Sequence, residues 1–70
     1  MNKYDLYKIR ELREDHDLSQ HKVYTDLNIP KNTYIGYETG EVIPPFNFMI
    51  KIAVYYNVSL DYLAGLKKTP

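Results

Sequence analysis

A polar cluster lies at residues 31–33, where Lys31, Asn32 and Thr33 follow directly after a proline. A lysine can donate to the acceptor edge of guanine or to a phosphate, and an asparagine can pair in bidentate fashion with adenine. A threonine offers a hydroxyl group to either partner and a methyl group to thymine. The same residues would also form an ordinary polar first turn of a surface helix, and their spacing alone favours this simpler interpretation.

A second polar cluster, Gln20, His21 and Lys22, follows Ser19. The Ser19 hydroxyl can cap a helix by accepting from an otherwise unpaired backbone amide of its first turn. Gln20 would then lie at a helix N-terminus, where backbone amides and the helix dipole favour a phosphate. This cluster, too, could be a solvated helix surface.

The stretch from Gln20 to Tyr37 that carries both clusters predicts two short helices joined by a tight turn. Val23 and Leu27 are four residues apart, and Tyr34 and Tyr37 are three apart, so each pair lies on one face of its helix. The helix ends carry residues typical of these positions: Asn28 ends the first helix, Pro30 begins the second and Gly40 ends it.

Three further helices are predicted around this pair. The first runs from about Asp5 to His16, the fourth from about Phe46 to Tyr56 and the last from Leu60 to about Leu66. The apolar stripe of the fourth helix comprises Phe46, Met49, Ile50, Ala53 and Tyr56, and Ile52 and Tyr55 broaden it. No strand alternation occurs, so the fold class is all-α, with one domain over residues 1–66 and a polar tail over residues 67–70.

The composition excludes several classes of protein. A chain of 70 residues without cysteine has room for one small domain and no disulfide or thiolate-metal framework. No apolar run approaches the roughly 20 residues of a membrane span, so we expect a cytoplasmic protein without a membrane partner. His16 and His21 do not have the spacing of a metal pair on one helix, and we expect two surface histidines, no cofactor, no bound metal and no enzyme activity.

Three blocks of sequence in fixed order carry a resemblance to a known family. They are IRELR…LSQ at residues 9–20, NTYIGYETG at residues 32–40, and the segment that ends in NVSLDYLAG at residue 65. With these blocks the chain resembles the lambda-repressor-like helix-turn-helix family of the Cro and phage-repressor type. The resemblance implies a compact five-helix domain in which the second and third helices form the motif, with the third lying in the major groove of DNA.

The resemblance also implies a site. By position, the residues expected to face DNA are Gln20, His21, Lys22, Lys31, Asn32, Thr33 and Gly36. Arg13 and Glu38 match a position at which the family places an ion pair between its first and third helices. The expected function is a sequence-specific transcription regulator, most simply a repressor. A weak homodimer on a palindromic operator is expected, with Tyr55, Tyr62 and Leu66 as candidate dimer contacts. The two tyrosines could equally well belong to the core.

Three residues depart from the family pattern, and they leave a second hypothesis open. Tyr24 is expected to turn outward or push the two helices apart, because the family has a small residue there. Pro30 removes a side-chain cap, and Gly36 provides no side chain to contact a base. Together with a net charge of zero and Ile35, which is expected to be exposed, these features also fit a protein-interaction or antitoxin-like module on the same scaffold.

Overall fold

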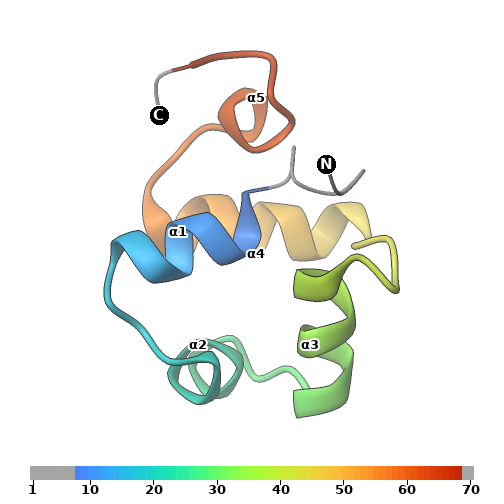
Figure 1. The fold of residues 1–70 in the computed structure, drawn as a ribbon. Coiled ribbons are helices and arrows are strands. Elements are labelled where there is room, and N and C mark those ends of the chain that lie inside the picture. The colour runs from blue at the N-terminus through green and yellow to red at the C-terminus, as the bar shows by residue number, and fades with distance from the viewer. Residues whose placement is uncertain (1–7, 69–70) are drawn as a thin grey trace.

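The computed structural model describes residues 8–68, and within that range the chain forms five α-helices and no strand (Figure 1). The helices are α1 (Ile9–Asp15), α2 (Gln20–Asp26), α3 (Lys31–Thr39), α4 (Phe46–Tyr56) and α5 (Leu60–Leu63). Helix α2 packs against α3, α1 against α3, and α4 against α5. The predicted all-α, five-helix fold is therefore confirmed.

Local sequence chemistry determines most of the helix ends. Ser19 and Ser59 each accept a hydrogen bond of 3.0 Å from the backbone amide three residues later, and so cap α2 and α5. Gly40 ends α3 and Asn57 ends α4, both in the left-handed conformation that such ends require, with φ of 87° and 57°. Pro30 precedes α3 without a side-chain cap, as predicted.

Two predicted helix boundaries are wrong. Lys8 is the N-cap of α1 with φ of 56°, so the helix does not run through residue 8, and residues 5–7 of the predicted helix lie outside the described range. Helix α5 ends at Leu63 rather than Leu66, because Gly65 adopts a left-handed conformation with φ of 80°. Both breaks occur where a residue leaves the right-handed helical region.

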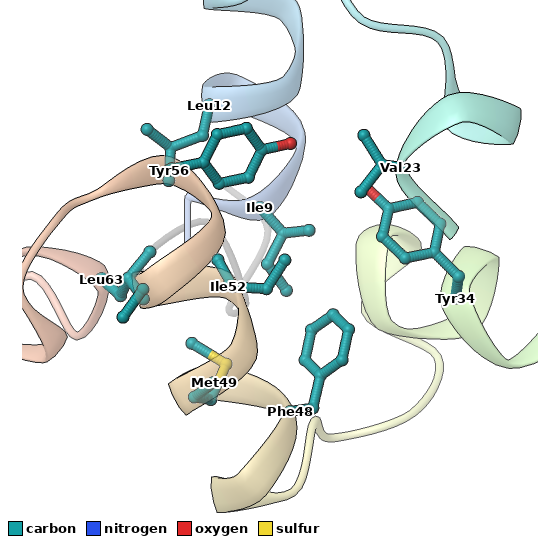
Figure 2. Packing of buried hydrophobic residues seen from close by; sticks show 10 residues of the cluster. Ile9, Leu12, Val23, Tyr34, Phe48, Met49, Ile52, Tyr56 and Leu63 are labelled. Atoms are coloured by element: carbon teal, nitrogen blue, oxygen red, sulfur yellow. The ribbon is translucent and has the colours of Figure 1, made fainter. Parts of the chain in front are cut away.

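Side chains from all five helices meet in one hydrophobic core (Figure 2). Its buried members are Ile9, Leu12, Val23, Tyr34, Phe48, Met49, Ile52, Ala53, Tyr56 and Leu63. The predicted inner stripe of α4 is only partly correct, since Phe46 is 70% exposed and Ile50 is 41% exposed. A helix that is apolar on most sides does not reveal by periodicity which face it buries.

Helices α2 and α3 cross rather than run parallel. Figure 1 shows α2 along its axis and α3 from the side, with the turn at residues 27–30 between them. Tyr24 is half-buried in this crossing, and its ring centroid lies 6.2 Å from that of Tyr34 and 5.3 Å from that of His21. The bulky residue expected between the helices is thus accommodated by edge-to-face and tilted contacts with neighbouring rings.

Candidate nucleic-acid interface

The first turn of α3 presents three polar side chains to solvent. Lys31, Asn32 and Thr33 are all exposed, whereas Tyr34 immediately after them is completely buried. The first turn lies at the end of α3 that is farthest from α5 in Figure 1. Among residues 8–68, the ion pairs of the structure do not include Lys31. This end of α3 therefore offers hydrogen-bond donors, an acceptor and a positive charge to a partner outside the chain.

The polar cluster of α2 is divided between two sides of that helix. Gln20 Nε2 donates to Glu38 Oε1 over 3.1 Å, so the side chain of Gln20 points toward α3. Lys22 instead pairs with Asp26, with its Nζ atom 3.3 Å from the carboxylate oxygens. Gln20 and Lys22 project about 160° apart around a helix of 3.6 residues per turn. His21 lies between them and is exposed.

Glu38 connects α3 to the two preceding helices. The Arg13 guanidinium makes a bidentate contact, with Nε 3.0 Å from Glu38 Oε2 and Nη2 3.0 Å from Oε1. Arg13 Nη1 also donates to the carbonyl oxygen of Leu18, at 2.9 Å, in the segment that leads into α2. The Glu38 side chain is only 3% exposed and the Arg13 side chain 14%. This ion pair fixes the orientation of α3 relative to α1. Separating the two helices would leave each buried charge without its partner, which is energetically costly.

The electrostatics of this pair favour its charged form. Burial acts to raise the pKa of Glu38, but hydrogen bonds, that of Arg13 foremost, outweigh burial and lower the pKa below its ordinary value. The hydrogen bond to Glu38 in turn raises the pKa of Arg13. Burial, with Glu38 nearby, raises the pKa of the Tyr34 hydroxyl. The carboxylate of Glu38 therefore stays ionised inside the motif at neutral pH.

Gly36, which was expected to face DNA, is not exposed to solvent in the structure. The residue is buried, and a Cβ atom built on it would lie 3.0 Å from Cγ2 of Val42. The turn that follows α3 thus folds back over Gly36. A glycine inside a helix can indicate such a close approach, but the sequence did not reveal which residue would cover it.

Two further features of this region were not predicted. The Tyr55 hydroxyl of α4 donates to Asp26 Oδ2 of α2 over 2.6 Å, and this bond raises the pKa of Tyr55 to about 12. Ile35 was expected to be exposed but is half-buried. Strongly exposed apolar side chains occur on α4 instead, at Phe46 and Val54.

Both histidines are exposed, as predicted. The His16 ring lies over Tyr56, with centroids 4.9 Å apart, and its Nδ1 atom is 2.9 Å from the carbonyl oxygen of Leu12. Within residues 8–68 there is no group of three or more side chains that could hold a metal ion. No helix in this described part of the chain has the length and hydropathy needed to cross a membrane.

Comparison with known proteins gives two significant relatives and a family match. The chain is 35% identical over 63 residues to the uncharacterized HTH-type transcriptional regulator YobD of Bacillus subtilis (strain 168). It is 37% identical over 62 residues to the cryptic phage CTXphi transcriptional repressor RstR of Vibrio cholerae. These alignments cover 90% and 89% of this chain but 56% of each relative, so the chain spans about half the length of the curated relatives it matches.

No solved structure gives a significant match. The family model described as helix-turn-helix matches residues 9–63, which include all five helices of the structure. The match contains the Arg13–Glu38 pair and both polar clusters at the α2–α3 crossing. The chain therefore belongs to the helix-turn-helix family.

Proposed function

We propose that this domain binds double-stranded DNA in a sequence-specific manner and represses transcription from the site it occupies. The observation that carries the proposal is the exposed first turn of α3, with Lys31, Asn32 and Thr33 on a helix whose orientation is fixed by the buried Arg13–Glu38 pair. A helix held in this way can enter the major groove, where these side chain types match base edges. A relative named as a phage transcriptional repressor supports the regulatory role.

Within this proposal the two helices have different tasks. Lys31, Asn32 and Thr33 contact bases or the nearest phosphates, and α2 crosses the phosphate backbone. Gln20 is held in place by Glu38, and His21 lies beside it on the exposed side of α2. Lys22 contributes positive charge at the edge of the interface, where Asp26 partly neutralises it.

A single domain of this size makes few contacts, so we propose that two copies bind a palindromic operator. Half-sites one helical turn apart, about 34–36 Å, place two such helices in successive major grooves on one face of DNA. Leu66 is 78% exposed and is the best candidate for a contact between copies. Tyr55 and Tyr62 are half-buried, and the hydroxyl of Tyr55 already binds Asp26. Such a regulator would act in the cytoplasm, where bacterial or phage DNA is accessible.

The test is selection of bound duplexes from a random pool, followed by mobility-shift titrations of the selected sequence at several salt concentrations. We expect a palindromic consensus and an affinity that falls steeply with salt, because phosphate contacts release counterions. Sedimentation of the free protein and of the complex measures the number of copies. Absence of salt-sensitive binding to every duplex in the pool would refute the proposal. The alternative of a protein-interaction module loses one of its supports, because Ile35 is half-buried rather than exposed.

A further inference from the structure

The surface formed by the first turn of α3 continues one helical turn further along the same face. Gly36 lies four residues after Asn32 and three after Thr33, and residues at these spacings are neighbours on one side of a helix. Asn32 and Thr33 are exposed, whereas Gly36 is buried. Whatever covers Gly36 therefore extends the surface that Asn32 and Thr33 begin.

The residue that covers Gly36 is Val42. Its backbone amide donates to the carbonyl oxygen of Gly36 over 3.1 Å, and the amide of Gly40 donates to the same oxygen over 3.1 Å. A Cβ atom on Gly36 would lie 3.0 Å from Val42 Cγ2 and 3.5 Å from Val42 Cβ. The isopropyl group of Val42 thus takes the space of a residue-36 side chain, and its position is fixed by backbone hydrogen bonds.

Val42 is not hidden by this packing, because it remains 49% exposed. The turn at residues 41–45, Glu-Val-Ile-Pro-Pro, contains no lysine or arginine and one carboxylate. It therefore has no cation for a DNA phosphate, and a contact of Val42 with DNA would be apolar. In the major groove the apolar feature that distinguishes one base from the others is the C5-methyl group of thymine.

Resting on the proposed DNA binding, we infer that Val42 is a specificity-determining residue that contacts the C5-methyl group of a thymine in the major groove. Asn32 and Thr33 then select base pairs by hydrogen bonding, and Val42 selects a thymine beyond them through its methyl groups. Gly36 makes this close packing possible, because a Cβ atom at position 36 would lie 3.0 Å from Val42 Cγ2 and Val42 would have to shift.

The test uses the duplex selected for the parent protein, with each thymine replaced in turn by deoxyuridine, which removes only the C5-methyl group. We expect one thymine in each half-site at which this replacement weakens binding by about fourfold, the effect of withdrawing one methyl group from contact. In Val42→Ala we expect binding to the thymine duplex to fall by about the same factor. The loss of affinity caused by deoxyuridine, here called the deoxyuridine penalty, should then disappear. Such non-additivity identifies a direct contact.

Ile43→Ala is the matched control, because Ile43 is an apolar neighbour on the same turn, 64% exposed, that does not contact Gly36. This variant should retain the full deoxyuridine penalty. Val42→Thr preserves the volume over Gly36 and replaces one methyl group by a hydroxyl group, so it tests the contact if Val42→Ala is poorly folded in thermal melts. We expect a reduced penalty in Val42→Thr.

The outcomes separate the inference from the proposed function. Salt-sensitive binding by the parent with no deoxyuridine penalty at any thymine would overturn the role of Val42 and leave DNA binding intact. A penalty that persists in Val42→Ala and Val42→Thr, or one lost in Ile43→Ala, would overturn it as well. If the parent protein showed no salt-sensitive binding to any duplex, the proposed function itself would be refuted.

Discussion

Arg13 of α1 holds Glu38 of α3 through two parallel hydrogen bonds of 3.0 Å, in a part of the molecule where the Glu38 side chain is almost fully withdrawn from solvent. Removing one partner of a buried pair leaves the other charge uncompensated. We expect Arg13→Ala to lower the free energy of unfolding by about 3 kcal/mol in urea denaturation. Arg10→Ala is the control, because its pair with Glu14 is exposed on both sides and is worth at most about 0.5 kcal/mol. Equal denaturation midpoints for the two variants would contradict a structural role for the Arg13–Glu38 pair.

The same pair predicts a dependence of stability on pH. Hydrogen bonds lower the pKa of Glu38 in the folded protein below its ordinary value of 4.5. A carboxyl group with a lowered folded pKa stabilises the protein fully above its unfolded pKa, and this contribution is lost as pH falls through the folded pKa. We expect the free energy of unfolding to fall in acid below about pH 5. In Glu38→Gln the free energy of unfolding should fall less steeply with decreasing pH, because position 38 no longer titrates. Urea denaturation at several pH values measures this slope for both proteins. Equal slopes would contradict the expected contribution of Glu38.

Lys31 is expected to contribute one phosphate or base contact that depends on salt. Lys31→Ala should weaken binding to the selected duplex and reduce the slope of log affinity against log salt by about 1. Lys22→Ala should have a smaller effect, because Asp26 already neutralises part of its charge. Arg10→Ala, on the exposed face of α1, serves as the control and should leave the slope unchanged. A larger change in slope for Lys22→Ala than for Lys31→Ala would indicate that DNA contacts the Lys22 side of α2 rather than the first turn of α3.

Asn57 ends α4 with φ of 57° and ψ of 49°, in the left-handed region. This conformation costs most residues about 1–2 kcal/mol, costs asparagine less and costs glycine almost nothing. We therefore expect Asn57→Ala to lower the thermal midpoint and Asn57→Gly to match or exceed the parent. The order of the three midpoints is the measurement, and an alanine variant as stable as the glycine variant would show that backbone strain is not what Asn57 relieves.

Tyr56 contributes a buried hydroxyl group that has no hydrogen-bond partner among the described residues. Burial raises the pKa of this hydroxyl, and an unsatisfied polar group in a core costs about 1–3 kcal/mol. Tyr56→Phe keeps the ring packed against His16 and removes the hydroxyl, so we expect stability to rise by about 1 kcal/mol in urea denaturation. A loss of stability would show that the hydroxyl is hydrogen-bonded in solution, for example by a buried water molecule.

The sequence by itself determined the features of this protein that depend on local chemistry. Ser19 and Ser59 cap helices because a hydroxyl group can reach an unpaired amide of the first turn, and Gly40 and Asn57 end helices because they tolerate positive φ. These effects act over a few residues, and so they can be recognised without knowledge of the remaining chain. Together with apolar periodicity they predicted the order of five helices, and the resemblance to a known family implied that the second and third of these form the helix-turn-helix.

Only the tertiary structure decided how these elements meet. Helix α4 buries Phe48 and exposes Phe46, although both are aromatic, because the neighbouring helices cover only one of its apolar faces. Gln20 points toward Glu38 while Lys22 is paired with Asp26, so a polar cluster that is continuous in sequence is divided in space. Gly36 was expected to be exposed to DNA, but it is buried, because the turn after α3 places Val42 over it. Such contacts depend on how separate segments pack together, and neither periodicity nor capping chemistry contains that information.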